Sequence, residues 1–183
     1  MKQTKKITVS AMAVALTVIF MAIGAFVEAL DLTAAALASV IVMFVFIEVG
    51  KPYHFLVWLG SSFLCFVFFP QSFVWINYLL IFGIYPILKA YIERAARWLW
   101  VLLKLVFFNI TAVLLIFASE LIFGIPFFEN DLSIPFLGEN TFILKAAIYV
   151  LLIVAMMVYD FFVTVMARFY FARVRPRIEK MLK

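Results

Sequence analysis

The sequence predicts an all-α, polytopic membrane protein with six transmembrane helices and cytoplasmic N- and C-termini. Hydrophobic residues make up 68% of the 183-residue chain, well above the roughly 45–50% of soluble domains. Only 14% of the residues are charged, too few to cover a water-facing surface. Apolar runs recur at lengths that suit a helical bilayer crossing, which takes about 20 residues. Residues 1–183 are therefore expected to form a single transmembrane domain, multi-pass in the cell membrane and surrounded by membrane lipid.

The N-terminal part of the chain contains the first two expected spans. Residues 7–27 carry no Asp, Glu, Lys or Arg and are long enough for one crossing. The basic residues before them are typical of a signal peptide, but the apolar segment of a signal peptide has only about 7–15 residues, so we expect a retained helix. The second span, residues 32–49, follows Asp31 and carries Glu48 near its far end. Both carboxylates are therefore expected near the membrane interfaces.

The third and fourth expected spans come from one long apolar run. Residues 52–88 contain no Asp, Glu, Lys or Arg and are nearly twice as long as one crossing requires. A Pro-Gln-Ser sequence at residues 70–72 is typical of a turn. A turn there divides the run into two helices, residues 53–69 and 73–88, which form a hairpin.

The C-terminal half contains the last two expected spans, residues 98–123 and 142–166. The segment between them, residues 124–140, forms the longest outer loop and contains two apolar Ile-Pro-Phe sequences. Such a loop either folds back over the bundle as a lid or anchors at the membrane interface. The sequence leaves both alternatives open.

The basic residues determine the expected orientation, because cytoplasmic segments of membrane proteins are enriched in Lys and Arg. One side of the six-span arrangement carries 13 of the 15 Lys and Arg residues: Lys2, Lys5, Lys6, Lys51, Lys89, Arg94, Arg97, Arg168, Arg173, Arg175, Arg177, Lys180 and Lys183. The opposite side carries five carboxylates: Glu28, Asp31, Glu129, Asp131 and Glu139. We therefore expect both termini in the cytoplasm and an acidic outer face.

Rare residues limit the chemistry that the chain can perform. With one cysteine (Cys65) and one histidine (His54), the sequence offers no internal disulfide, no CxxC pair and no histidine metal cluster. No metal and no other cofactor is therefore expected. The cations lie at the ends of apolar runs rather than on a separate polar domain, so no nucleic-acid partner is expected either.

The sequence does not favour an enzyme. It has no GxSG sequence, no pair of intramembrane aspartates and no Walker A loop. The acidic residues of the inner side, Glu48, Glu93 and Glu179, are isolated along the chain and show no metal-binding carboxylate cluster. Any ATP-driven activity would need a separate energy source.

Ionisable side chains inside a span are costly and mark candidate functional sites. Lys104 in the fifth span and Asp160 in the sixth lie at matching depths, so we expect them to form a structural ion pair. Glu120 and Lys145 likewise lie at matching depths, near the outer ends of the same two helices.

Helical phase suggests a polar surface in the outer half of these two spans. At about 100° per residue, Asn109 lies about 20° from Glu120, and Tyr149 lies about 40° from Lys145. We therefore expect these four side chains to line an outward-opening substrate pocket, with Asn77 of the fourth span as part of its wall. The alternative is that Glu120 and Lys145 only pair or extend to the lipid headgroups.

The first span carries a small-residue face in the sequence Ala11-Met12-Ala13-Val14-Ala15, which permits close helix approach. With six spans, cytoplasmic termini and no ATPase motif, the chain resembles the substrate-binding S components of energy-coupling factor (ECF) transporters. The resemblance implies that Ala11 and Ala15 dock on a transmembrane coupling protein driven by cytosolic ATPases. It also implies a micronutrient bound near the outer surface, without identifying that small-molecule substrate.

The expected function is therefore a membrane-embedded binding subunit of an ATP-driven uptake transporter. The first alternative is a non-transport scaffold of a cell-envelope assembly. In size and span number, such a chain resembles the rod-shape protein family. The second is a membrane enzyme without a recognisable catalytic set. A binding subunit should enclose an outer cavity of roughly 300 Å³ or more with convergent polar groups, whereas a scaffold should have a tightly packed interior.

Overall fold

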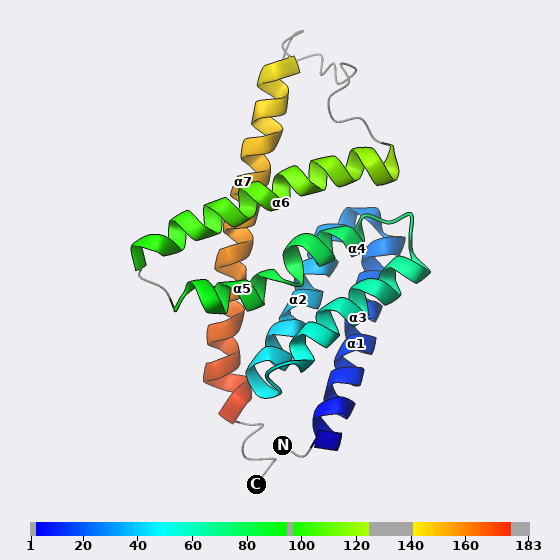
Figure 1. Ribbon diagram of the computed structural model, residues 1–183, viewed down its shortest axis with the longest axis vertical. Helices are drawn as coiled ribbons and strands as arrows, with labels where there is room; N and C mark the ends of the chain where they lie inside the picture. The colour runs from blue at the N-terminus through cyan, green and yellow to red at the C-terminus, as the bar shows by residue number, and fades with distance from the viewer. Residues whose placement is uncertain (1–2, 95–96, 125–140, 177–183) are drawn as a thin grey trace.

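The computed structural model (Figure 1) describes residues 3–94, 97–124 and 141–176, and their side chains except those of residues 28, 97, 123 and 141–145. This part of the chain is all-helical, as predicted, and contains no strand. Five helical segments are long and apolar enough to cross a membrane: Gln3–Phe26, Asp31–Glu48, Val74–Ile92, Trp98–Ile122 and Ala146–Val174. A shorter apolar helix covers Tyr53–Phe68. The chain is thus a helical protein with several potential membrane spans.

The helices begin and end close to the expected boundaries. They are α1 (Gln3–Phe26), α2 (Asp31–Glu48), α3 (Tyr53–Phe68), α4 (Val74–Asn77), α5 (Tyr85–Ile92), α6 (Arg97–Phe123) and α7 (Thr141–Phe169). Three shorter turns of other helix types are η1 (Glu28–Leu30), η2 (Tyr78–Phe82) and η3 (Tyr170–Val174). The main differences are in the fourth and sixth spans. The fourth is predicted to end at residue 88 but continues to Ile92 and is divided into α4, η2 and α5. The sixth is predicted to end at residue 166 but continues through α7 and η3 to Val174.

Small residues allow α1 and α2 to pack closely (Figure 1). Ala34, Ala35 and Ala38 of α2 are buried, as is Gly24 near the end of α1. A Cβ atom on Gly24 would lie 2.8 Å from the Cβ of Ala34, closer than side chains normally approach. With α3 and α4 packed on them, these helices form the core that supports the rest of the chain.

A break between η2 and α5 has a clear backbone cause. A helix would pair the Phe82 carbonyl with the amide of residue 86, but that residue is proline and has no N–H. The Tyr159 hydroxyl of α7 lies 3.0 Å from the Phe82 carbonyl oxygen and donates to it. The buried carbonyl is therefore satisfied by another helix, which also fixes α7 against the bundle.

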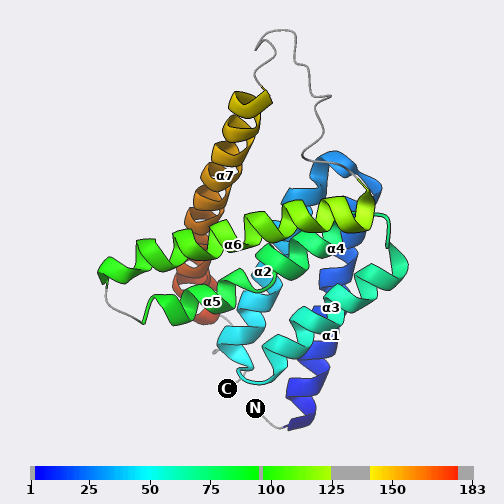
Figure 2. The same ribbon diagram turned by 45° about the horizontal axis from the view of Figure 1, so that its top comes forward.

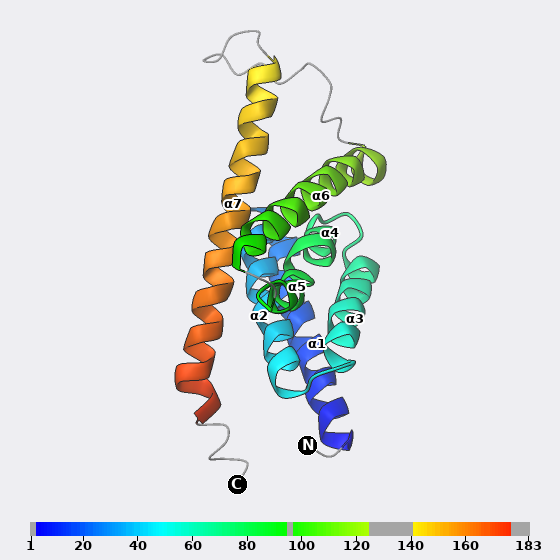
Figure 3. The ribbon, with the colours of Figure 1, turned by 60° about the vertical axis from the view of Figure 1, so that its left-hand side comes forward.

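Helices α6 and α7 are the most peripheral part of the fold. Figures 1 and 3 show α6 crossing α7 obliquely, so that the C-terminal half of α6 diverges from the first turns of α7. Both helices expose large apolar side chains, among them Leu102, Phe117, Leu121, Leu151 and Phe161. Surfaces of this kind suit contact with lipid chains rather than water.

The two ends of the described chain lie at the same end of the molecule. Figures 1 and 3 show the start of α1 and the end of η3 at the lower end of the view, whereas Figure 2 shows the α1–α2 turn at the opposite end from the start of α1. The cationic side chain of Lys51 belongs to the α2–α3 turn, on the side of the termini. The α3–α4 turn, residues 69–73, lies on the side of the α1–α2 turn.

Candidate functional site

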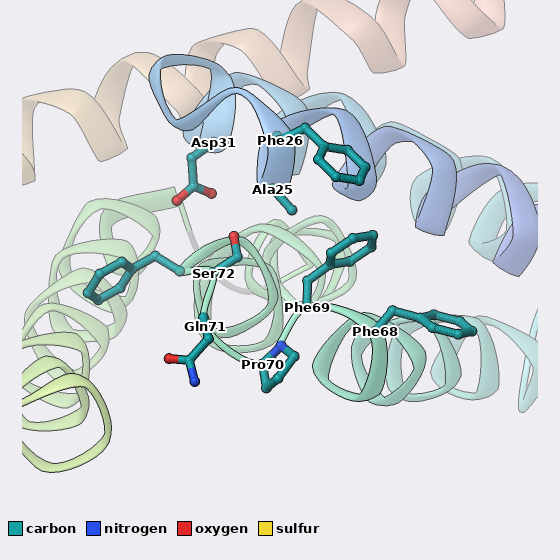
Figure 4. A pocket seen from close by; sticks show the side chains of 10 residues that line it. Ala25, Phe26, Asp31, Phe68, Phe69, Pro70, Gln71 and Ser72 are labelled. Atoms are coloured by element: carbon teal, nitrogen blue, oxygen red, sulfur yellow. The ribbon is translucent and has the colours of Figure 1, made fainter.

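The α1–α2 and α3–α4 turns border an open cavity of about 590 Å³, which we call the outer cavity. Its described lining combines apolar and polar side chains: Gly24, Ala25, Phe26, Asp31, Phe68, Phe69, Pro70, Gln71, Ser72 and Phe73. In Figure 4 the Asp31 carboxylate and the Ser72 hydroxyl point toward each other from two sides of the opening. The volume and the mixture of groups are typical of a small-molecule site.

Local sequence explains how these polar groups are positioned. Asp31 is the first residue of α2, directly after the η1 turn, where the positive end of the helix dipole favours a carboxylate. Pro70 follows the end of α3, and the Ser72 hydroxyl accepts a hydrogen bond from the Val74 amide at 3.3 Å. Two helix starts therefore direct polar side chains toward the same space.

Aromatic rings form another wall of the outer cavity. The rings of Phe26 and Phe69 meet edge to face, with centroids 5.4 Å apart and an interplanar angle of 77° (Figure 4). This geometry is the favoured one for two aromatic rings. It ties the end of α1 to the end of α3 and keeps both rings beside the polar groups.

A second candidate region is a charged cluster between α5, α6 and α7, which we call the interhelical network. It is centred on Asp160, whose carboxylate accepts hydrogen bonds from Lys104 at 3.0 Å to each oxygen and from the Tyr85 hydroxyl at 2.6 Å. Lys89 binds the same carboxylate and donates to the Thr164 hydroxyl at 2.6 Å. The three helices are thus joined through one carboxylate.

Glu93 completes the charge balance of the network. Its carboxylate lies 3.3 Å from the Lys104 ammonium and 3.7 Å from that of Lys89. Two lysines therefore face two carboxylates, and the cluster is neutral overall. The side chain of Lys89 is only 6% exposed, so its charge depends on these partners rather than on water.

The structure brings Lys104 and Asp160 together, at the position where α6 and α7 cross. It also pairs the Tyr149 hydroxyl with the side-chain oxygen of Asn109. It does not gather the expected pocket, because Glu120 and Asn109 are exposed and Asn77 lies elsewhere. The physical reason is the oblique crossing, which separates the outer halves of α6 and α7 (Figure 1).

Asn77 lines a different, mostly apolar cavity of about 480 Å³ between α2, η2, α6 and α7. Only Thr33 and Tyr159 accompany it as residues with polar side-chain atoms among the described lining. In the described part of the chain, Asn77 therefore lies apart from the Asn109–Tyr149 pair and from the exposed Glu120. The substrate-binding role of these residues stays a prediction.

Other expected site residues can be placed only in part. Ala11 and Ala15 are exposed on α1, where they are accessible to lipid or to a partner helix. Lys145 belongs to α7, but its side chain lies outside the described part. So do residues 125–140 of the loop 124–140, whose role as a lid stays a prediction. Among the described residues, no group of three or more His, Cys, Asp or Glu side chains could hold a metal ion.

Some residues of the interhelical network do not follow from the sequence reasoning. The sequence predicts Lys89 on the cytoplasmic side and Glu48 and Glu93 at isolated positions. In the structure, Lys89 is buried in α5 and Glu93 pairs with two lysines. Glu48 accepts a 2.7 Å hydrogen bond from Tyr170. The spacing of four residues between Lys89 and Glu93 is an available signal, because such residues share a helix face.

Two features of the described chain bear on function: the outer cavity around Asp31 and the interhelical network around Asp160. Comparisons with protein-family models, with curated proteins and with solved structures find no match. Function must therefore be inferred from these two features and from the exposed face of α1.

Proposed function

We propose that this chain is a multi-pass membrane protein that binds a small molecule at its outer face as the binding subunit of an ATP-driven uptake transporter. It crosses the membrane six times and has cytoplasmic termini. A separate transmembrane coupling protein and cytosolic ATPases supply the energy, because the sequence has no Walker A loop. The bound molecule is a micronutrient or a similar small solute.

The outer cavity is the observation that carries this proposal. The turns that border it lie at the end of the molecule opposite the start of α1 and the end of η3 (Figure 1), and its volume of about 590 Å³ exceeds the roughly 300 Å³ that a small-molecule site requires. The polar groups of Asp31, Gln71 and Ser72 border it. A scaffold that acts only through partner helices has no use for such a cavity.

Six crossings require that α3 also spans the membrane. Its 16 residues extend about 24 Å at 1.5 Å per residue, somewhat less than the hydrocarbon thickness of about 30 Å. Local thinning of the bilayer accommodates a mismatch of this size at modest cost. The α2–α3 turn, with Lys51, then lies in the cytoplasm and the α3–α4 turn lies outside.

Cysteine labelling in intact cells tests this topology. The single native cysteine, Cys65, is buried, so a Cys65→Ser background is suitable for single-cysteine reporters. We expect a membrane-impermeant maleimide to label Gln71→Cys in intact cells, but Lys51→Cys and Pro176→Cys only after permeabilisation. Labelling of Lys51→Cys and Pro176→Cys on different sides of the membrane would exclude an even number of crossings after α2.

Native purification tests the functional proposal directly. Mass spectrometry of the protein purified in mild detergent is expected to identify a co-purifying small molecule together with ATPase partner chains. Recovery of envelope-synthesis proteins without any small molecule would support the scaffold alternative and contradict uptake. The substrate need not be chosen in advance, because the mass spectrum identifies whichever molecule the protein retains.

The exposed small-residue face of α1 provides a mutational prediction. Ala11→Leu or Ala15→Leu adds bulk where close helix approach needs a small side chain, and we expect association with the coupling protein to fall by about tenfold or more, equivalent to about 1.4 kcal/mol. Co-purification yield of partner chains measures the effect. Ala147→Leu, an equal change at an exposed position of α7, is the matched control. Unchanged association of both α1 variants would remove the docking proposal.

A further inference from the structure

The charge of the outer cavity points to the class of its ligand. Asp31 is the only charged side chain among the described residues that line the cavity. No lysine or arginine borders it there, so no side chain of this lining carries a positive charge for an anionic ligand.

The aromatic residues of the lining also favour a cationic ligand. Four phenylalanines, Phe26, Phe68, Phe69 and Phe73, are among the lining residues, and aromatic faces attract cations through their negative quadrupole. Phe26 and Phe69 are held together edge to face at the border of the cavity (Figure 4). A carboxylate beside aromatic rings therefore favours an ammonium group attached to an apolar body.

The expected charge of the outer face supports a cationic ligand. In the proposed topology, the outer segments of the sequence carry Glu28, Asp31, Glu129, Asp131 and Glu139, against the single cation Lys145. A surface of one sign raises the local concentration of oppositely charged solutes and speeds their association. Both the approach of the substrate to the outer face and its binding in the cavity would then favour a positively charged molecule.

We propose that the outer cavity binds a small organic cation, whose ammonium group pairs with Asp31 and whose apolar part contacts the phenylalanine rings, with Gln71 and Ser72 as hydrogen-bonding groups. The inference rests on the proposed function because it assigns the substrate class of the same site. It does not depend on how uptake is energised, since binding can be measured on the isolated chain.

Matched probe pairs test the charge preference on the full-length protein in detergent. Choline is compared with its neutral isostere 3,3-dimethylbutan-1-ol, and benzylamine with benzyl alcohol, by thermal shift and by isothermal titration. We expect at least one cation to bind about tenfold or more tightly than its neutral partner, as combined ion-pair and cation–π interactions require. Equal binding within both pairs, tighter binding of the anion 3,3-dimethylbutyrate, or no binding of either cation would overturn the proposal.

Substitutions locate the binding to the outer cavity. Asp31→Asn keeps the shape of the side chain but removes its charge, so the preference for the cation should fall to within about twofold, which corresponds to about 0.4 kcal/mol. Glu48→Gln removes the carboxylate at the other end of α2, outside the described lining, and should leave the preference unchanged. If Asp31→Asn does not elute as a folded protein, Phe69→Leu is used in its place and should weaken cation binding more than binding of the neutral partner. If the folded cavity variant still binds the cation more tightly than the neutral partner by the original factor, the cation does not bind in the outer cavity.

The outcomes separate this inference from the transport proposal. Cation binding at the outer cavity without any ATPase partner in the native purification would support the ligand class and contradict uptake. ATPase partners without cation binding would support uptake and contradict the ligand class.

Discussion

Asp160→Ala is expected to destabilise the fold by about 3–5 kcal/mol, because breaking a buried ion pair leaves its partner charges uncompensated. The Asp160 carboxylate accepts from Lys104, Lys89 and Tyr85, which belong to two other helices. Its removal leaves two lysines with only Glu93 as an acidic partner in the network. Lys89 cannot turn to water without repacking, since only 6% of its side chain is exposed.

The free energy of unfolding in mixed detergent–SDS micelles measures this effect. Glu120→Ala is the matched control, because it removes a carboxylate that is exposed on α6. The double variant Lys89→Met/Asp160→Leu should recover part of the loss, since it leaves Lys104 paired with Glu93, whose oxygen is 3.3 Å away. Equal stability of Asp160→Ala and Glu120→Ala would show that the network does not hold the three helices together.

Whether the network also serves function can be decided with the same variants. Charged groups at membrane depth are costly and often functional, but here every charge of the cluster has an opposite charge beside it. A purely structural role predicts that the stability-recovered double variant still binds the ligand of the outer cavity. Loss of ligand binding in that variant would instead indicate coupling between the network and the cavity.

The apolar helices could be predicted from the sequence because the bilayer fixes their length. A crossing needs about 20 apolar residues, and uncharged runs such as residues 7–27 show this directly. The turn at residues 70–72 was also predictable, since Pro70 interrupts the run where α3 ends. Each of these features depends on local sequence alone.

The candidate pocket could not be predicted because it depends on how helices cross. Placing Glu120 beside Lys145 requires α6 and α7 to run side by side along their full length. The crossing angle depends on side-chain packing between helices, which residue spacing does not reveal. Matching depth identifies Lys104 and Asp160 as partners because both lie close to the crossing, where the angle has little effect.

Part of the lining of the outer cavity can be predicted from the expected topology. Asp31 and residues 70–72 are both expected at outer turns, so their side chains can be placed on the same side of the membrane. What the sequence does not show is that α1 and α3 lie side by side, which brings Phe26 to Phe69. The close packing of α1 against α2 and α4 at Gly24 is likewise not singled out by any sequence motif.

Gly83→Ala is expected to destabilise the fold by about 1–3 kcal/mol, the usual cost of overpacking a filled site. A Cβ atom at this position would overlap the Trp58 ring and lie 2.9 Å from the Tyr78 carbonyl oxygen. The Trp58 indole donates a 3.2 Å hydrogen bond to the Leu79 carbonyl, and moving the ring would break that link between α3 and η2.

Gly60→Ala is the matched control, and its effect should have the opposite sign. A Cβ atom there meets only one described neighbour within 4 Å, Val14, at an ordinary contact distance of 3.8 Å. Alanine favours a helix over glycine by about 0.5–1 kcal/mol, so Gly60→Ala should be neutral or stabilising in the same unfolding assay. In a Trp58→Leu background, which frees the space, Gly83→Ala should cost less, and the difference gives the coupling between the two positions. Equal effects of both glycine substitutions, or no coupling with Trp58, would mean that the indole does not pack on η2. The contact between α3 and η2 would then be held in another way.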